Sequence, residues 1–210
     1  MTQNFIVCIG RQYGSGGREI GELAAKKLGV TCYDKLLIQE AAKRSGVDET
    51  YIADNDETLS GELLPFSGNC FADAADLSNL FYAPGEESFT AEAGEIRAIA
   101  GRESAVIIGR CASSVLSGRE NVLSVFLYAG EASRVARIAK RNGLTEHAAR
   151  ERMEKINRMR KHYFNFHSLT DWGKPESYDL MLATDRLGAE ACAELIARAV
   201  REKLEGADHE

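Results

Sequence analysis

Residues 5–21 constrain the fold of this chain more than any other stretch, because they read as a strand, a glycine-rich loop and a helix in direct succession. The apolar residues 5–9 have the length and β-branched content of a buried strand. From Arg18 onward, apolar residues recur at helical spacing until Gly29. The loop between them holds Gly14, Ser15, Gly16 and Gly17. Such loops turn backbone N–H groups toward an anion, and the helix start adds positive charge, so the stretch predicts a phosphate-binding turn.

The loop departs from the Walker pattern, G-x-x-x-x-G-K-[ST], at three positions. Arg11 stands in place of the first glycine, Gly17 in place of the lysine, and Arg18 in place of the Ser or Thr that holds magnesium. An ordinary glycine-rich turn is therefore the alternative interpretation. Arg18, and also Arg11, are candidates for the positive charge that the lysine would give, since arginine grips phosphate oxygens bidentately.

Five apolar segments alternate with helical segments along the chain. The expected strands are residues 5–9, 30–34, 104–110, 122–128 and 178–184. The expected helices are residues 18–28, 36–46, 88–101, 112–116, 131–141, 145–163 and 189–204, with a turn at 185–188. This alternation predicts an α/β three-layer sandwich, with a mostly parallel five-stranded sheet and helices on both faces.

Length and composition favour one domain over residues 1–210. A net charge of −6 argues against a general nucleic-acid binder. The five cysteines include no C-x-x-C pair, which argues against both a disulfide framework and a zinc site. No signal peptide or apolar run of membrane-spanning length is present, so we expect a cytoplasmic protein without a membrane partner. Oligomeric state cannot be read from the sequence.

Charged residues follow two of the predicted strands. Asp34 and Arg110 lie at the carboxyl ends of strands, the edge where open α/β sheets bind ligands. Each has a simpler interpretation, since Asp34 could cap the next helix and Arg110 could begin one in solvent. Arg97, on the helix expected at 88–101, is a weaker ligand candidate because a lone helical arginine usually lies on a solvated face.

Two further regions bear on the site. Residues 47–87 are irregular in pattern and are interpreted as a substrate-binding or partner-binding insertion. Residues 131–165 contain two helices dense in arginine, including Arg137 and Arg160. Next to a phosphate-binding turn these helices suit a lid that closes on a nucleotide triphosphate, although two amphipathic helices with solvated charges are the alternative.

Taken together, these stretches resemble the cytidylate kinase-like family, a divergent branch of the P-loop nucleoside monophosphate kinases. The residues that carry the resemblance are 10–21, Tyr33-Asp34, 107–110, 126–128 with Arg134 and Arg137, 160–163, Trp172 and 178–180. The resemblance spans nearly the whole chain and implies a P-loop NTPase-type fold.

The resemblance also implies roles for individual residues. The loop residues Gln12, Tyr13, Gly14, Ser15, Gly16, Gly17 and Arg18 would hold ATP phosphate, Asp34, Arg110 and Asn157 would lie at the acceptor site, and Arg160 would contact the transferred phosphate. From their charge and place in the chain, we add Arg11 to the phosphate-binding candidates and Arg97 to the acceptor-binding candidates. In a phosphotransferase, Arg18, Arg137 and Arg160 would act in catalysis by neutralising developing charge. Mg²⁺ would be held mainly by phosphates and waters, with Ser15 a weak candidate ligand. Cys111 and Asn157 depart from the pattern of true cytidylate kinases, which the resemblance implies would have aspartate at both positions.

Three functional hypotheses follow. The first is an ATP-dependent phosphotransferase acting on a small-molecule nucleotide, with CMP or dCMP the best candidate for the acceptor. The second is a nucleotide-binding sensor or interaction protein without catalysis, because the Walker motif is degraded. A dinucleotide-dependent oxidoreductase is a distant third, since the glycine spacing is not G-x-G-x-x-G.

Overall fold

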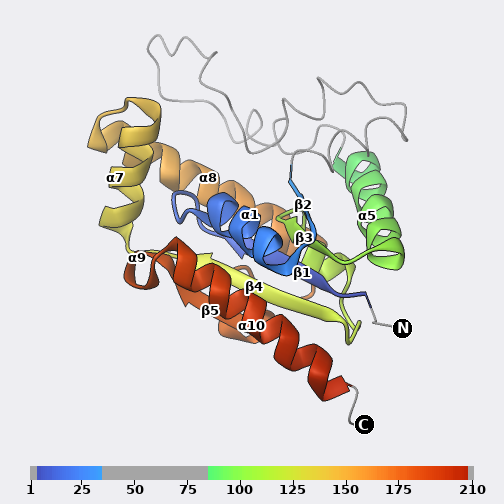
Figure 1. The fold of residues 1–210 in the computed structure, drawn as a ribbon. Helices are drawn as coiled ribbons and strands as arrows, with labels where there is room; N and C mark the ends of the chain where they lie inside the picture. The colour runs from blue at the N-terminus through green and yellow to red at the C-terminus, as the bar shows by residue number, and fades with distance from the viewer. Residues whose placement is uncertain (1–3, 35–84, 208–210) are drawn as a thin grey trace.

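A computed structural model describes residues 4–34 and 85–207 of the chain (Figure 1). Within these residues one sheet forms, and all its strand pairs are parallel. Its strands are β1 (Ile6–Arg11), β2 (Thr31–Tyr33), β3 (Ala105–Ile108), β4 (Val122–Tyr128) and β5 (Leu180–Ala183), in the spatial order β2-β3-β1-β4-β5. The predicted five-stranded parallel sheet is confirmed.

Helices cover both faces of the sheet, as Figure 1 shows. They are α1 (Gly17–Leu28), α5 (Gly85–Arg102), α6 (Ala112–Val115), α7 (Glu131–Asn142), α8 (Glu146–His167), α9 (Thr184–Leu187) and α10 (Ala189–Ala207), with a 3₁₀ turn at Pro175–Ser177. On one face, α1 and α10 bury Ile20 and Ile196 against alternate residues of β1 and β4. On the other, α5 and α6 bury Ile96 and Leu116. The predicted three-layer arrangement is therefore confirmed.

The central strand lies where the sequence pattern placed it. The first four residues of β1 are fully buried, because β1 pairs with β3 on one side and with β4 on the other. Such a strand has no solvent-facing side, which explains its continuous apolar run. The carboxyl end of β1 leads directly into the glycine loop and α1, so the sheet holds the loop at its ligand-binding edge.

Helices α7 and α8 form a separate pair beyond the carboxyl end of β4 (Figure 1). Gly143 ends α7 in a left-handed conformation (φ 64°), and the Thr145 hydroxyl caps α8 by accepting from the Ala148 N–H. Apolar residues from both helices, among them Ile138 and Met153, pack together with Tyr13 of the loop. The helix pair is thus anchored on the glycine loop itself.

Several predicted boundaries were wrong. The first strand continues to Arg11 instead of ending at residue 9, and the strand expected at 104–110 ends at Ile108, because residues 109–111 all have positive φ angles. The turn expected at 185–188 is largely the short helix α9. Helix α5 begins at Gly85, inside the predicted insertion, and α8 runs one turn past residue 163. The helix predicted at 36–46 and residues 47–84 lie outside the described residues.

No helix among residues 4–34 and 85–207 combines the length and the apolar character needed to cross a membrane.

Candidate functional site

The loop between β1 and α1 is held by strand β4 and adopts left-handed turns at two glycines. Gly14 and Gly16 have φ angles of 82° and 80°, conformations that a side chain disfavours. Both the backbone and the side chain of Gln12 bond to the end of β4 and the residue after it. The Gln12 N–H donates to the Leu127 carbonyl at 2.9 Å, and the side-chain Oε1 accepts from the Ala129 N–H at 3.2 Å. Because Gly16 caps α1 without any side-chain hydrogen bond, the first N–H groups of the helix face the loop with no capping oxygen.

Ser15 lies inside this loop. Its side chain is buried, and its hydroxyl donates to the Gln12 carbonyl at 2.8 Å. The Ser15 carbonyl in turn accepts from the hydroxyl of Thr184, the first residue of α9, at 2.7 Å. Ser15 is therefore a structural residue in this conformation. Its predicted role as a magnesium ligand stays a prediction, and it would require the hydroxyl to leave the Gln12 carbonyl.

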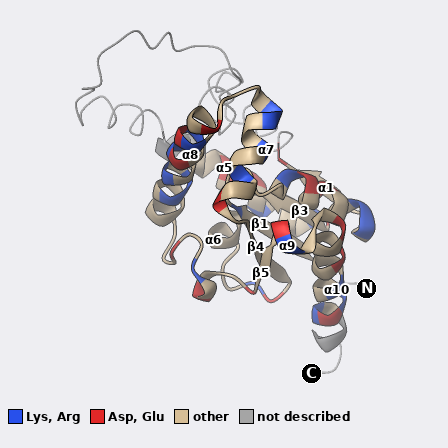
Figure 2. Cartoon of the chain, turned by 90° about the vertical axis from the view of Figure 1, so that its left-hand side faces the viewer, with Lys and Arg blue, Asp and Glu red and all other residues tan. Residues whose placement is uncertain are grey.

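The arginine-rich helices bring three predicted site residues onto the loop, and Figure 2 shows Lys and Arg recurring along both helices. Arg160 of α8 donates to the Arg11 carbonyl at 3.1 Å, and its guanidinium lies 5.6 Å from the centre of the Tyr13 ring. Arg137 of α7 lies against Gly16, where its guanidinium fills the space that a Cβ would need, and it donates to Glu19 at 3.3 Å. The Asn157 amide oxygen accepts from the Tyr13 N–H at 2.8 Å.

Asn157 therefore contacts the loop in this structure, whereas the family resemblance assigns its position to the acceptor. Its hydrogen bond ties α8 to the backbone of the loop, one helical turn from Arg160. This geometry supports a positioning role for Asn157, and its acceptor role stays a prediction.

Arg134, also on α7, is buried beside the loop. Its Nε donates to the Ala129 carbonyl at 2.9 Å, while its Nη1 has no hydrogen-bond partner among the described residues. Burial lowers the pKa of the guanidinium, and the negative charge of Asp185 acts in the opposite direction. A buried guanidinium N–H without a partner is costly, and an acceptor atom of a ligand would satisfy it.

Arg11, Arg18 and Asp34 meet where β1 and β2 end. Both arginines lie 3.8 Å from a carboxylate oxygen of Asp34. Arg18 also pairs with Glu22 at 3.0 Å, and the hydrogen bond to Glu22, followed by the charge of Asp34, raises the pKa of the guanidinium. The Arg11 side chain is only 12% exposed, compared with 49% for Arg18. Asp34 thus faces the loop, as its strand-end position predicted.

Arg110 is engaged by a carboxylate that the sequence analysis missed. Its Nη1 lies 3.1 Å from Oε1 of Glu92, a residue of α5 that is 2% exposed. Tyr163 of α8 donates its hydroxyl to the other oxygen of Glu92 at 3.2 Å. Burial, and then the negative charge of Glu92, raise the pKa of the Tyr163 hydroxyl. Glu92 could have been found from its spacing, since it falls on the same helical face as Phe89, Ala93 and Ile96.

The backbone that presents Arg110 is unusual. Gly109, Arg110 and Cys111 have φ angles of 79°, 56° and 51°, and the last two are the only non-glycine residues with positive φ in the described part of the chain. Such conformations cost free energy and tend to occur at ligand-binding sites. The Phe89 ring stacks on His167, with 3.8 Å between ring centres, and meets Tyr163, the partner of Glu92, edge-on at 6.2 Å. Arg97 is exposed elsewhere on α5.

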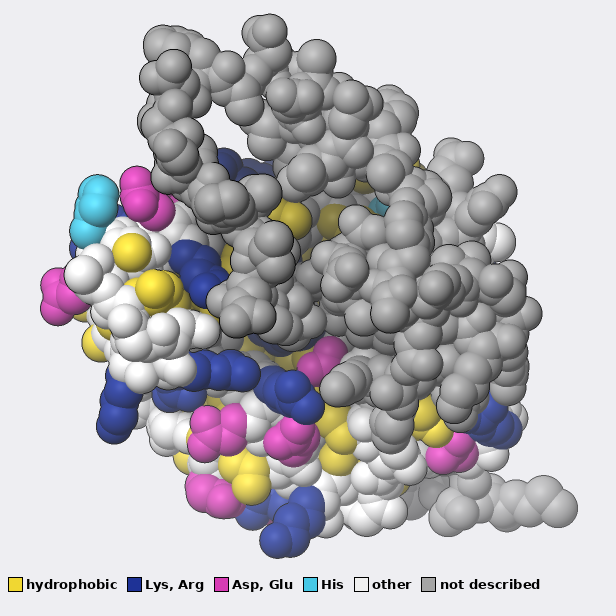
Figure 3. All heavy atoms as spheres, turned by 90° about the horizontal axis from the view of Figure 1, so that it is seen from above, with side chains coloured by type: hydrophobic (Ala, Val, Ile, Leu, Met, Phe, Trp, Pro, Cys, Tyr) yellow, Lys and Arg dark blue, Asp and Glu magenta, His cyan; other side chains and the backbone are white. Residues whose placement is uncertain are grey.

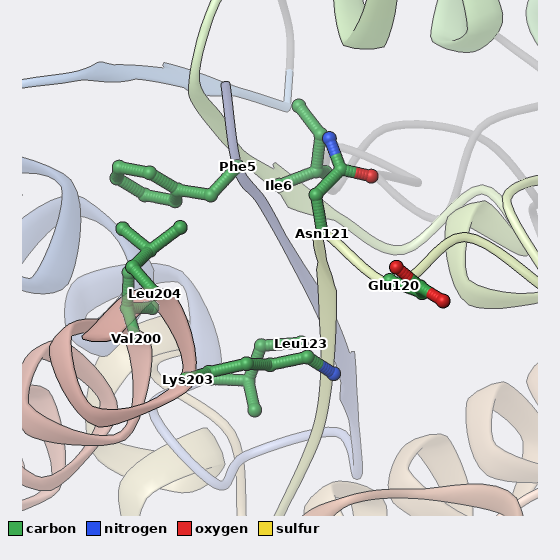
Figure 4. Close-up of a pocket in the computed structure, with 8 residues that line it drawn as sticks. All are labelled: Phe5, Ile6, Glu120, Asn121, Leu123, Val200, Lys203 and Leu204. Atoms are coloured by element: carbon green, nitrogen blue, oxygen red, sulfur yellow. The ribbon is translucent and has the colours of Figure 1, made fainter. Parts of the chain in front are cut away.

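Other surfaces offer less chemistry. A small apolar hollow between β1, β4 and α10 is lined by Phe5, Leu123, Val200 and Leu204 (Figure 4), at the opposite end of β1 from the loop. On the part of the upper face that Figure 3 leaves in view, side chains of Lys and Arg are interspersed with those of Asp and Glu. Among residues 4–34 and 85–207, no group of three or more His, Cys, Asp or Glu could hold a metal ion.

Comparisons with known proteins agree with this arrangement. The model of the cytidylate kinase-like family matches residues 6–186, whereas a search of curated proteins finds no match. An uncharacterized protein from Eubacterium ventriosum has a TM-score of 0.70 at 24% identity, covering 94% of this chain and 99% of that one. Two shikimate kinases have a TM-score of 0.52 and cover 96% of this chain. One, from Acinetobacter baumannii in complex with shikimate, is 16% identical and 94% covered; the other, from Bacteroides thetaiotaomicron, is 15% identical and 98% covered.

These structural likenesses, all at low identity, show the fold alone. The family model matches most of the chain. The chain belongs to the cytidylate kinase-like family and has the fold of P-loop kinases, which supports a phosphotransferase of the kinase type.

Proposed function

We propose that this protein transfers the γ-phosphoryl group of ATP to a nucleoside monophosphate, with CMP or dCMP the first candidates. The observation that carries the proposal is the convergence of Arg11, Arg137 and Arg160, from three separate elements, on one glycine loop. Phosphoryl transfer needs reactants held in line and positive charge around the transferred group, with little covalent chemistry from the protein. Arginines preorganised around a phosphate-binding loop supply both.

The loop and its neighbours fit ATP. Gly14 and Gly16 shape a backbone cradle at a helix N-terminus, and the unpartnered Nη1 of Arg134 supplies a buried donor beside it. Mg²⁺ fits less directly, because the Ser15 hydroxyl is bonded within the loop. We therefore assign the metal mainly to phosphate oxygens and water, as in other sites that hold Mg²⁺ with few protein ligands.

The acceptor would lie between the loop and the ends of β2 and β3. Asp34 would orient it, while Arg11 and Arg160 would neutralise charge that develops during transfer. Arg110 is already balanced by Glu92, so a phosphate placed there would also meet a buried carboxylate. The Arg110–Glu92 pair, with donors and an acceptor atom side by side, suits the edge of a neutral base better than a phosphate.

The proposal is tested by a phosphotransfer assay with ATP–Mg and a panel of acceptors: CMP, dCMP, UMP, AMP and, because shikimate kinases share the fold, shikimate. We expect ADP formation that depends on one nucleoside monophosphate. Transfer to shikimate alone would replace the nucleotide acceptor with a hydroxy acid. ATP hydrolysis that no acceptor stimulates would contradict the proposal.

A second candidate function is nucleotide binding without catalysis. It is favoured by one observation, the absence of both the lysine and the Ser or Thr of the Walker motif at Gly17 and Arg18. Saturable ATP binding without transfer to any acceptor, and without hydrolysis, would identify this function.

A further inference from the structure

Two departures from the Walker pattern, at positions 11 and 17, lie against each other in space. The pattern places a glycine at the first position and a lysine at the seventh. This chain has the cation first, as Arg11, and the glycine seventh, as Gly17. Arg11 is the last residue of β1 and Gly17 is the first residue of α1. The loop between them folds back, so the two residues lie in contact.

The two positions cannot both carry a side chain. A Cβ on Gly17 would lie 2.8 Å from the Cβ of Arg11, 2.9 Å from its Cδ and 3.2 Å from its Cγ. Carbon atoms in van der Waals contact are separated by about 3.5–4.0 Å. The stem of Arg11 therefore runs through the space where a side chain at position 17 would begin. Even the first carbon of the Arg11 side chain is too close for a residue with a Cβ at position 17.

The guanidinium of Arg11 ends beside the predicted acceptor site. Its Nη1 lies 2.5 Å from where a Cβ on Gly109 would stand, and its Nη2 lies 3.8 Å from Asp34. The Arg11 carbonyl accepts from Arg160, which fixes the backbone at the root of this side chain. Arg18, the other candidate, also lies 3.8 Å from Asp34, but it pairs with Glu22 on its own helix and is half exposed. Burial therefore favours Arg11.

We infer that Arg11 and Gly17 form an exchanged pair, in which the strand end supplies the phosphate-binding cation that the Walker motif places on the helix. The inference rests on the proposed ATP site. As in the Walker motif, one cationic side chain would lie near the transferred phosphate. Here it would come from Arg11 at the strand end, before the loop, and not from a lysine at the start of the helix, after the loop. Glycine at position 17 is then required because Arg11 occupies its side-chain space, and arginine gives a bidentate donor where lysine gives a point charge.

The test is a set of coupled substitutions in the full chain, with ATP–Mg affinity measured by isothermal titration and folding by melting temperature. Arg11→Gly should weaken ATP–Mg binding at least tenfold while the protein stays folded. Gly17→Lys should weaken binding and also lower the melting temperature, because the lysine stem meets Arg11. The double variant Arg11→Gly with Gly17→Lys should recover the melting temperature and bind ATP–Mg within about threefold of the wild type, since both Walker residues are then restored.

A second double variant sharpens the test. Arg11→Ala with Gly17→Lys should fail to recover, because the alanine Cβ still lies 2.8 Å from the Cβ at position 17. Lys27→Ala, in the last turn of α1 and at the opposite end of the helix from the loop, controls for the loss of one positive charge and should bind ATP–Mg as the wild type does. Additive effects of the Arg11 and Gly17 substitutions would overturn the inference, as would normal binding by Arg11→Gly. A wild type that binds no ATP–Mg would overturn the proposed function as well, so the two failures are distinguishable.

Discussion

A single residue, Arg160, connects the glycine loop to the pair of helices α7 and α8. It donates to the Arg11 carbonyl and lies over the Tyr13 ring, so it reaches the loop at two adjacent residues. Its distance along the sequence from the loop is 149 residues, and only the fold brings the two together. An arginine held in this way can respond to charge on a transferred phosphate without reorganising.

We predict that Arg160→Ala lowers kcat by about 10³-fold or more while the KM for the acceptor changes much less, because the lost charge acts mainly in the transition state. Steady-state kinetics with the acceptor identified by the panel provides the measurement. Arg158→Ala is a matched control on the same helix, since Arg158 is 72% exposed and pairs only with the nearby Glu154 in the described structure. Equal kcat in Arg160→Ala and Arg158→Ala would refute the role of Arg160.

The residues of the site were only partly predictable from the sequence. The glycines, Asp34 and the arginines of α7 and α8 could be named as candidates, because their chemistry is tied to a local motif, to a strand end or to a basic helix. The partners of Arg110 could not, since Glu92 and Tyr163 come from two different helices. From the sequence alone, an arginine at a strand end is interpreted as an anion-binding residue, because the carboxylate that pairs with it in the structure cannot be identified.

At the level of secondary-structure elements, the junction between β5 and α9 supports the loop. Thr184, the first residue of α9, is 4% exposed, and its hydroxyl lies 2.7 Å from the Ser15 carbonyl and 3.2 Å from the Tyr128 carbonyl. One side chain that directly follows β5 thus joins the end of β4 to the loop at the ligand-binding edge.

We predict that Thr184→Val lowers the free energy of unfolding by about 1–3 kcal/mol, because the substitution keeps the shape but leaves a buried carbonyl without its donor. Urea denaturation gives the value. Thr31→Val, at an exposed position of β2, is the control and should change stability by less than about 0.5 kcal/mol. Equal stability of the two variants would show that the Thr184 hydrogen bonds contribute nothing.

The contact between α5 and α8 through Tyr163 and Glu92 predicts a dependence on pH. The pKa of Tyr163 is raised in the folded protein, so the folded state keeps this proton at a pH where the unfolded state, with a pKa of about 10, has lost it. The stability that Tyr163 adds is therefore complete below about pH 10 and falls as the pH rises above that value.

Tyr163→Phe should accordingly be less stable than the wild type at pH 8, by about 1.5–3 kcal/mol for a lost hydrogen bond to a charged group. Melting temperatures measured from pH 8 to pH 11 should show the difference between the two proteins shrinking above about pH 10. A difference that stays constant over this range would contradict the raised pKa.

For the whole molecule, the sequence predicted the fold class more securely than the site. Alternation of apolar strands with helices was enough for a parallel three-layer domain, because both faces of such a sheet must be covered. The order β2-β3-β1-β4-β5 was not predictable, since each strand carries the same apolar signal whatever its neighbours. That order places β1 and its loop centrally, between Asp34 and Arg110 on one side and α7 and α8 on the other.

Three predictions about the whole molecule stay predictions: a cytoplasmic location, the lack of nucleic-acid binding, and the closure of residues 131–165 as a lid. The insertion predicted at 47–87 lies mostly outside the described residues.

Isothermal titration of ATP–Mg into the wild type and into Gly16→Val tests the central claim most directly. Valine is strongly disfavoured at a φ of 80°, and its Cβ would meet the Arg137 guanidinium, so the substitution distorts the cradle without removing a charge. We predict one ATP per chain for the wild type and at least tenfold weaker binding for Gly16→Val, with the variant still showing a cooperative melting transition. Absence of binding to the wild type would contradict the assignment of the glycine loop as a phosphate site, and with it the proposed kinase.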